Sequence, residues 1–264
     1  MKAKDLMTPN PIVMHKQDRI ENVLDLMRKH NISKIPVVDD GRLVGIITDG
    51  EVLDELGAAK NRAISPTNLH VSGAMQRDFK TKTVGPETDL RAVIEMCKQE
   101  GVGMVPVVEG DHDGKLVGII TKADLLKLVV STAPLRDIMK KQLHSVEPAD
   151  RLIHARRLMM DHGIERLPVL DGGRVVGIVS EMDIALALDD FKKRHSPEHQ
   201  KNQIKNLVVD DVMRRQVITA PPDLPANVAA QRMRTEDIGG LPVVTGDDHI
   251  AGMVTRTDLI RLIP

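Results

Sequence analysis

A fourfold internal repeat constrains this chain more than any other feature of its sequence. Each copy carries a methionine, then a proline between apolar residues, then a glycine, then a hydroxyl residue three positions after the glycine, and a carboxylate three positions after the hydroxyl. Agreement at five positions in four copies is not expected by chance, so the chain consists of four versions of one unit. The five positions are Met7, Pro36, Gly45, Thr48 and Glu51; Met75, Pro106, Gly118, Thr121 and Asp124; Met139, Pro168, Gly177, Ser180 and Asp183; and Met213, Pro242, Gly252, Thr255 and Asp258.

The size of the unit predicts how the copies assemble. The 264 residues give roughly 66 residues per copy, and a unit that small seldom buries enough apolar surface by itself. Two copies together make a module of about 130 residues, which is an ordinary domain size. We therefore expect repeats at 1–60, 68–130, 132–190 and 206–264, paired into modules 1–130 and 132–264.

Within each copy, the order of apolar residues predicts a strand, a helix, two strands and a second helix. Apolar residues at helical spacing predict the first helix. In the first copy a turn at Asp39, Asp40 and Gly41 separates the two strands, as in a β-hairpin. The predicted fold class is therefore α/β (α+β), with β-α-β-β-α repeats and small mixed sheets. The helical stripes are Ile20, Val23, Leu24 and Met27; Leu90, Val93, Ile94 and Cys97; Leu152, Ala155, Arg156 and Met159; and Ala226, Ala229, Ala230 and Met233.

Composition excludes several classes of protein. Hydrophobic residues make up 41% of the chain and the net charge is −1, so no large single-sign field is expected to attract nucleic acid or an anionic membrane. The chain has no Trp, no Tyr and two Phe, which leaves no aromatic platform for stacking bases. A single Cys excludes an internal disulfide, and we expect Cys97 to be a core residue. We find no signal peptide or transmembrane stretch, and we expect a cytoplasmic protein without a membrane partner.

The hydroxyl-x-x-carboxylate motif has two interpretations. It is typical of a helix capping box, in which the hydroxyl and the acid satisfy free backbone N–H groups. It also offers a carboxylate to two vicinal ribose hydroxyls, beside a helix N-terminus that favours phosphate. Both roles can coexist in the copies that carry Asp. Glu51, which is longer, fits the capping role better.

A second signal is a cation two residues before the proline in alternate copies. Lys34 and Arg166 occupy this position in the first and third copies, where the second and fourth have Met104 and Gly240. Such a cation could be a solvated residue on a strand edge. It could equally be a phosphate ligand, since Arg forms bidentate pairs with phosphate and Lys acts as a point charge.

Taken together, these motifs resemble the cystathionine-β-synthase (CBS) domain family over nearly the whole chain. The resemblance is carried by the apolar-Pro-Val-apolar step, the Gly-x-x-Thr/Ser-x-x-Asp element and a leading Asp-apolar-Met, although the second copy begins with Gly73-Ala74-Met75. It implies two so-called Bateman modules, each a pair of CBS motifs that binds adenosine-containing ligands in two clefts. Four motifs in one chain look like the regulatory γ subunit of AMP-activated kinase and like stand-alone archaeal and bacterial CBS proteins.

The resemblance also implies roles for particular residues. The carboxylates would hold ribose and the hydroxyls would assist at the phosphate. Lys34 would serve the cleft of Asp124, and Arg166 the cleft of Asp258. Apolar residues of the leading strands would contact adenine. The expected ligand-binding residues are Thr48, Thr121, Asp124, Ser180, Asp183, Thr255, Asp258, Lys34, Arg166, Ile12, Val84, Val146 and Ile218.

We therefore expect a non-enzymatic sensor of AMP, ADP, ATP or S-adenosylmethionine, acting as a homodimer or on a regulated partner. No catalytic residue, metal site or cofactor other than the nucleotide ligand is expected, because no nucleophile–base set or P-loop is present. The pair His195 and His199 reads as a solvated linker. The alternative is a protein- or nucleic-acid-interaction module without nucleotide sensing. Only the basic run Lys192 to Arg194, with Lys201 and Lys205, supports that alternative.

Overall fold

The computed structural model describes residues 1–58, 68–78, 82–99, 101–110, 114–195 and 206–264. Its four repeats are variations on one arrangement of a helix, an antiparallel hairpin and a second helix, as predicted. The first two repeats contain η1(Ala3–Asp5), β1(Thr8–Pro9), β2(Met14–His15), α1(Ile20–His30), β3(Lys34–Asp39), β4(Arg42–Thr48) and α2(Asp49–Gly57), then α3(Val71–Ala74), α4(Leu90–Lys98), β5(Met104–Glu109), β6(Lys115–Thr121), α5(Lys122–Leu125) and η5(Leu126–Leu128).

The third and fourth repeats follow the same order. Their elements are α6(Leu135–Ile138), α7(Leu152–His162), β7(Arg166–Asp171), β8(Arg174–Ser180) and α8(Glu181–Arg194), then η7(Val209–Asp211), α10(Ala226–Thr235), β9(Gly240–Val244), η8(Gly246–Asp248), β10(Ile250–Thr255) and α11(Arg256–Ile260).

The strand expected at the start of each repeat is short. In the first repeat it is β2, which pairs in parallel with β3. Its counterparts are single parallel bridges from Val84, Val146 and Ala220 to the residue after the repeat proline. The hairpin between β3 and β4 turns at Asp40 and Gly41, which both have positive φ, as the sequence of this turn requires.

Repeats pair through segments that cross from one to the other. β1 of the first repeat pairs with β6 of the second, and Gln76 returns to pair with Ile46 of β4. Lys140 and Arg214 make the same exchange with Met253 and Ile178 in the other half of the chain. Repeats 1 and 2 therefore form one module, and repeats 3 and 4 form the other.

These crossings explain why each repeat has its glycine and its methionine. A Cβ on Gly118 would lie 2.5 Å from Sδ of Met7, and a Cβ on Gly177 would lie 2.5 Å from Sδ of Met213. The corresponding distances are 2.8 Å between Gly45 and Met75 and 2.7 Å between Gly252 and Met139. Each glycine makes room for the methionine of its partner repeat, which is the usual meaning of a glycine inside a strand.

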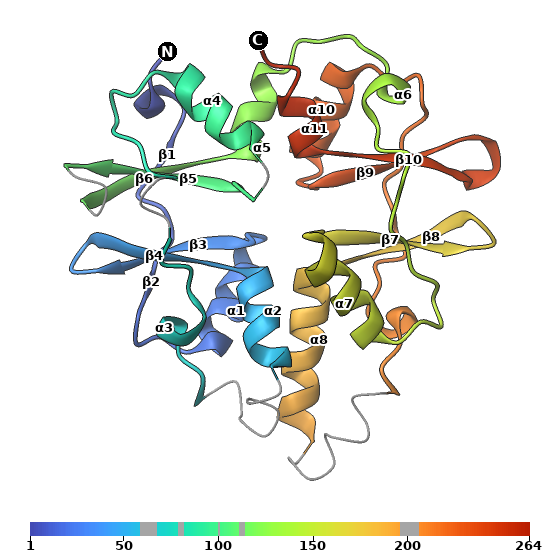
Figure 1. Cartoon of the computed structure of the whole chain (residues 1–264), viewed down its shortest axis with the longest axis horizontal. Helices are drawn as coiled ribbons and strands as arrows, with labels where there is room; N and C mark the ends of the chain where they lie inside the picture. The colour runs from blue at the N-terminus through green and yellow to red at the C-terminus, as the bar shows by residue number, and fades with distance from the viewer. Residues whose placement is uncertain (59–67, 79–81, 100, 111–113, 196–205) are drawn as a thin grey trace.

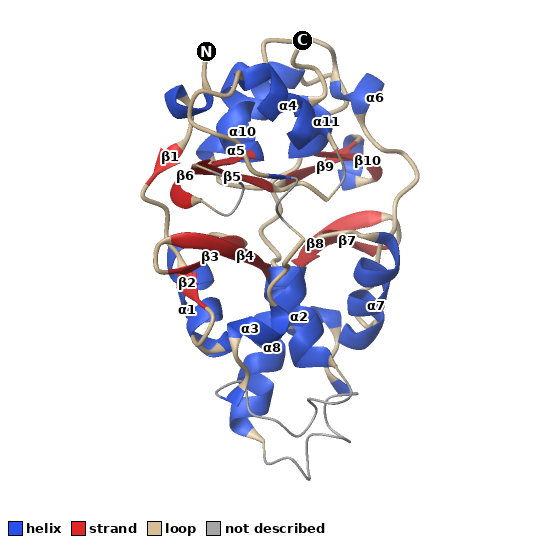
Figure 2. Ribbon diagram, turned by 60° about the vertical axis from the view of Figure 1, so that its left-hand side comes forward, coloured by secondary structure: helices blue, strands red, loops and turns tan. Residues whose placement is uncertain are grey.

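The two modules lie side by side (Figure 1). Within each module the sheets of the two repeats face one another, and the helices cover their outer faces. Helices α1, α2, α7 and α8 cover the sheets of repeats 1 and 3, and α4, α5, α10 and α11 cover those of repeats 2 and 4, as Figure 2 also shows. Two large hydrophobic cores follow this division, one uniting mainly repeats 1 and 3 and the other mainly repeats 2 and 4. A smaller cluster, including Leu43, Ile46, Met104 and Val108, lies between the sheets of the first module.

Three of the four predicted helical stripes are buried completely, and Cys97 is buried as expected. In the third repeat, Arg156 takes the place of an apolar residue. Its guanidinium reaches Asp54 of α2 in the other module, 3.5 Å from Nη2 to Oδ1.

Candidate functional site

Each hydroxyl-x-x-carboxylate motif is a capping box at the end of a hairpin. In repeat 2, Oδ2 of Asp124 accepts hydrogen bonds from the backbone N–H of Thr121 at 2.7 Å and from its hydroxyl at 2.8 Å. Asp183 and Asp258 use Oδ2 in the same way with Ser180 and Thr255. Glu51 caps with Thr48 through Oε2. The cap thus fixes one carboxylate oxygen and leaves the other for a different partner.

The second oxygen distinguishes the repeats. In the first repeat, Gln76 of the partner repeat donates to Oε1 of Glu51. In the third, Nε of Arg214 lies 3.0 Å from Oδ1 of Asp183. For Oδ1 of Asp124 the described residues provide no hydrogen bond, and Asp258 has only Arg261 at 4.0 Å. Among the described residues, the second carboxylate oxygen therefore has no close hydrogen-bond partner in repeats 2 and 4, although the side chain of Asp258 is only 6% exposed.

The hydroxyls of those same two repeats open into one central cavity of about 790 Å³, to which all four repeats contribute. Its wall is made of the segments that follow the leading Met in repeats 1 and 3, the ends of α1 and α7, and the starts of α5 and α11. The lining residues include Thr8, Asn10, Ile12, Asn31, Lys34, Thr121, Lys122, Lys140, His144, His162, Glu165, Arg166, Asp237, Thr255, Arg256 and Thr257.

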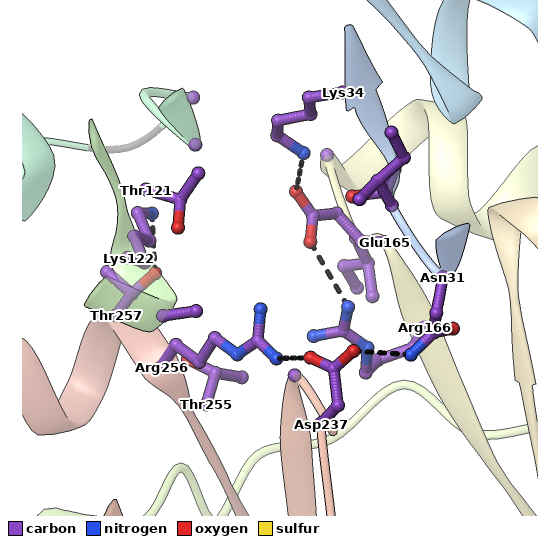
Figure 3. Close-up of a pocket in the computed structure, with 18 of the residues that line it drawn as sticks. Asn31, Lys34, Thr121, Lys122, Glu165, Arg166, Asp237, Thr255, Arg256 and Thr257 are labelled. Carbon is purple, nitrogen blue, oxygen red and sulfur yellow. Dashed lines mark hydrogen bonds and ion pairs between the residues drawn. The ribbon is translucent and has the colours of Figure 1, made fainter. Parts of the chain in front are cut away.

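Lys140 lines the cavity, and four further cations, one from each repeat, are labelled around it in Figure 3. Lys34 and Arg166 come from the starts of β3 and β7, and Lys122 and Arg256 come from the first residues of α5 and α11. The last two lie at helix N-termini, next to the capping hydroxyls, where backbone N–H groups also favour an anion. The combination is suited to a ligand with several negative charges.

Lys34 and Arg166 each lie against the partner repeat of their own module. A Cβ on Gly103 would lie 1.9 Å from Cε of Lys34, and a Cβ on Gly239 would lie 2.5 Å from the guanidinium of Arg166. The absence of side chains at Gly103 and Gly239 therefore provides the space that these cations occupy. Lys34 shares the cavity with Thr121, and Arg166 shares it with Thr255.

Polar contacts cross the cavity between modules. Nζ of Lys34 donates to Oε1 of Glu165 at 3.0 Å, and Nη2 of Arg166 donates to Oε2 of the same carboxylate at 3.3 Å. Asp237 accepts from Nδ2 of Asn31 at 2.6 Å and from Nη2 of Arg256 at 3.0 Å. Nζ of Lys122 donates to Oγ1 of Thr257 at 2.7 Å. Figure 3 shows these contacts as dashed lines that join separate groups of side chains around the cavity.

The charges of the cavity are strongly coupled. The charge of Lys34 holds the pKa of Glu165 at about 2, so this carboxylate is ionised at neutral pH. Burial works to lower the pKa of Lys34, but the charges of Glu165 and Asp49 outweigh it and leave that pKa above its ordinary value. Burial lowers the pKa of Lys122 and of Arg256.

Two further carboxyl groups lie buried between the modules, at the starts of α2 and α8. Burial raises the pKa of Asp49 to about 6, against the opposing charge of Lys34. Burial raises the pKa of Glu181 to about 8, and the charge of Asp49 adds to this effect. The residue directly after the capping hydroxyl thus differs between the repeats. It is acidic in repeats 1 and 3 (Asp49 and Glu181) and basic in repeats 2 and 4 (Lys122 and Arg256).

The cavity brings together part of the predicted site. Lys34, Arg166, Thr121, Thr255 and Ile12 line it. Asp124 and Asp258 themselves do not line it, and their ribose role stays a prediction. Elsewhere, the predicted residues Thr48, Ser180, Asp183 and Ile218 do not line this cavity.

The four predicted adenine contacts do not occupy equivalent positions in their repeats, and their role stays a prediction. Val84 and Val146 make the parallel bridge that Met14 makes in the first repeat, and both are buried in the hydrophobic cores. The residues in register with Ile12 are Lys82, His144 and Ile218. Of these, His144 lines the cavity and stacks on His162 with ring centroids 3.9 Å apart.

Sequence reasoning missed Lys122, Arg256, Glu165 and Asp237. A signal for the first two was present, because they directly follow the hydroxyl in the two repeats that lack Lys34 or Arg166. Asp237 and Glu165 gave no comparable signal, since their contacts depend on how the two modules face one another.

The basic run that supported the alternative function is largely paired within the chain. Nζ of Lys193 lies 2.9 Å from Asp189, and Nη2 of Arg194 lies 3.4 Å from Asp190. Lys192 is 6% exposed. Lys201, Lys205 and His199 lie outside the described residues.

The described part of the chain contains no helix long and apolar enough to cross a membrane. In the same part, no group of three or more His, Cys, Asp or Glu side chains is arranged to hold a metal ion.

Paired repeats whose hairpins end in capping boxes define a CBS-domain regulatory fold, and comparison with known sequences agrees. The CBS domain family matches residues 3–58, 71–131, 135–190 and 209–264. The chain belongs to the CBS domain family.

Among individual relatives, protein MJ1225 of Methanocaldococcus jannaschii is 27% identical over 267 residues, which cover 95% of this chain and 94% of the relative. A 33.4 kDa protein from the ribosomal RNA operon of Thermofilum pendens is 26% identical, with 97% and 89% covered. The crystal structure of MJ1225, described as a proposed archaeal homologue of γ-AMPK, covers 100% of both chains with a TM-score of 0.88 and 26% identity.

Proposed function

We propose that the chain is a non-enzymatic sensor of adenosine nucleotides, with two binding clefts that open into the central cavity. One cleft lies between Lys34 and the motif of Thr121 and Asp124. The other lies between Arg166 and the motif of Thr255 and Asp258. The observation that carries the proposal is the cavity of about 790 Å³, which is lined by one of the four cations from each repeat and by the capping residues Thr121 and Thr255.

The chemistry of the cavity supports a nucleotide over a neutral nucleoside. The outer oxygen of Asp124 or Asp258 accepts hydrogen bonds from ribose hydroxyls, while the cap holds the inner oxygen. Phosphate then lies near Lys122 or Arg256 at the helix N-terminus and near Lys34 or Arg166 across the cleft. Among adenosine ligands, AMP, ADP and ATP match these cations better than S-adenosylmethionine, which carries positive charge of its own.

The other two motifs are proposed to bind less strongly or not at all. Glu51 and Asp183 already accept hydrogen bonds from Gln76 and Arg214 through the oxygen that a ribose would need. The next residues, Asp49 and Glu181, are acidic and would repel phosphate. Two nucleotides per chain is therefore the expected stoichiometry.

Because both clefts open into a cavity lined by residues of both modules, a bound ligand would change how the modules face one another. That change is the proposed signal to a regulated partner or to a second copy of the chain. The two modules already pack against each other within one chain, because each large hydrophobic core contains residues of both.

Calorimetric titration of the purified chain with adenosine, AMP, ATP and S-adenosylmethionine tests this function. We expect AMP or ATP to bind and to raise the melting temperature, since a ligand of the folded state stabilises it by mass action. Asp124→Asn and Asp258→Asn replace one carboxylate oxygen by a donor, and each should weaken binding at its own cleft about ten- to a hundredfold.

Asp248→Asn, in an exposed turn, is the matched control and should bind as the unsubstituted chain does. If no adenosine compound at millimolar concentration binds, or if D124N and D258N bind as tightly as D248N, the proposed function is wrong.

A further inference from the structure

Glu165 is unlike its counterparts in the other repeats. The residue three positions before the repeat proline is Ser33 in the first repeat, Gly103 in the second and Gly239 in the fourth. In repeats 2 and 4 the missing side chain makes room for a cation. Only the third repeat places a long, charged side chain at this position, and that side chain lines the central cavity.

The carboxylate of Glu165 joins cations from both modules. Its two oxygens accept hydrogen bonds from Lys34 of the first module and from Arg166 of the second, at 3.0 and 3.3 Å. The two cations are largely enclosed, with side chains 17% and 24% exposed. Because they are shielded from water, they gain more from a nearby anion than surface residues would.

Lys34 and Arg166 are also the cations that face the two proposed clefts. A phosphate group presents charged oxygens with hydrogen-bonding geometry close to that of a carboxylate. The same donors cannot serve Glu165 and a phosphate fully at once. A nucleotide that reaches either cation must therefore displace an anion that is already in place.

We propose that Glu165 is a specificity-determining residue, a tethered counter-ion that competes with phosphate for Lys34 and Arg166 in both clefts. This inference rests on the proposed function for the identity of the clefts, but not for the competition itself. Glu165 lowers the affinity of the cavity for every anion, and it lowers it most for singly charged ones. A neutral nucleoside, which makes no contact with either cation, is unaffected.

The competition also connects ligand binding to the position of the modules. Lys34 and Glu165 form a direct ion pair between the first and second modules, as Figure 3 shows. Displacement of Glu165 by phosphate breaks this pair. Ligands without phosphate leave it intact, so the cavity distinguishes ligands by charge as well as by fit.

The test compares Glu165→Gln with the unsubstituted chain in calorimetric titrations with AMP, adenosine and inorganic pyrophosphate. Gln keeps the size of the side chain and removes its charge. We expect E165Q to bind AMP and pyrophosphate about tenfold more tightly, because a charged competitor has been removed. Adenosine affinity should stay within about twofold. Glu147→Gln, an exposed residue of the same repeat, should change none of the three.

A second variant guards against a folding defect in E165Q. Glu165→Ser introduces the residue that the first repeat already has at this position, Ser33, and it should shift AMP and pyrophosphate affinity in the same direction. Thermal unfolding without ligand checks that both variants are folded.

The outcomes separate the two proposals. If adenosine and AMP fail to bind the unsubstituted chain, the proposed function fails, while pyrophosphate still tests the competition. If AMP binds the unsubstituted chain but E165Q and E165S bind it equally or more weakly, Glu165 positions the cations for the ligand and the competition is refuted. The competition is also refuted if pyrophosphate binds equally tightly to the unsubstituted chain, E165Q and E165S, or if it binds to none of them.

Discussion

Glu181 and Asp49 are acidic residues whose burial cannot be read from the sequence around them. Both follow a capping hydroxyl and begin a helix, where an acidic residue ordinarily favours the helix dipole. In the folded chain, however, the carboxylate of Glu181 lies against Gly50 of α2 in the other module, about 3.0 Å from where a Cβ would stand. Burial and the charge of Asp49 then make its ionised form unfavourable.

The chain should therefore become less stable as pH rises toward 8. The pKa of Glu181 is about 8 in the folded state against an ordinary value of 4.5, so between these values the folded chain binds more protons than the unfolded chain. Its free energy of unfolding then decreases with rising pH in that window. Asp49, with a pKa of about 6 against 3.8, contributes the same sign at lower pH. Glu165, with its pKa lowered to about 2, acts in the opposite direction and only in acid.

Glu181→Gln isolates this effect. At pH 5 the unsubstituted Glu181 is already neutral, so E181Q should unfold with nearly the same free energy. At pH 8.5 E181Q should be more stable by at least about 1 kcal/mol. Urea unfolding at both pH values measures the difference, with Glu109→Gln at an exposed position as the control. A difference between E181Q and the unsubstituted chain that does not grow with pH would contradict this assignment.

At the residue scale, the sequence predicted the features that recur in every repeat. The hydroxyl and the carboxylate occur at fixed spacing, so the capping boxes could be anticipated, but not that the second oxygen of Asp183 is held by Arg214 while that of Asp124 accepts no hydrogen bond from the described residues. Lys34 and Arg166 were found because they break the pattern of their neighbours. The roles of Glu165 and Asp237 could not be predicted, because their partners Lys34 and Asn31 belong to the other module. Val84 and Val146 lie two residues out of register with Ile12, and both are buried in the cores, which the sequence pattern did not reveal.

The strands and helices could be predicted from the local pattern of apolar residues. The segments that cross from one repeat to pair with a strand of its partner repeat could not. The glycine and the methionine of each repeat were visible as recurring positions without an evident reason. Their contact lies between repeats, and only the exchange of β1 and its counterparts brings them together. The short leading strands were overestimated for the same reason, since in three of the repeats only one bridge remains.

Gly118→Ala tests the crossing of β1 over β6. The added Cβ would lie 2.5 Å from Sδ of Met7 and 3.1 Å from the backbone oxygen of Thr8, so the strands must separate or Met7 must move. We expect a loss of about 1–3 kcal/mol in the free energy of unfolding. Met7→Ala removes the first clash, so G118A should cost less in an M7A background. A double-mutant cycle in urea measures this coupling. Additive effects of the two substitutions would show that the contact is not what requires glycine.

At the scale of the whole molecule, the hydrophobic cores do not coincide with the modules. Pairing of sheets joins repeat 1 to repeat 2, whereas the largest cores join repeat 1 to repeat 3 and repeat 2 to repeat 4. Sequence could predict four units and their pairing, because each unit is too small to be stable alone. It could not predict which helices cover each other, since the apolar stripes are alike in all four repeats.

Because every large core contains residues of both modules, the chain should unfold as one cooperative unit. The single cysteine, Cys97, reports on this from the core of repeats 2 and 4, where burial raises its pKa to about 11 and protects it from thiol reagents. Met159→Ala leaves a cavity in the other core, in the other module, at an expected cost of about 2–5 kcal/mol.

If unfolding is cooperative, M159A should speed the labelling of Cys97 by a thiol reagent, by about tenfold for each 1.4 kcal/mol of lost stability. Met160→Ala, at an exposed position of the same helix, should leave the labelling rate unchanged. Were the modules independent, M159A would lower the melting temperature of the second module while Cys97 in the first stayed protected. The two labelling rates therefore decide whether the two modules unfold together or independently.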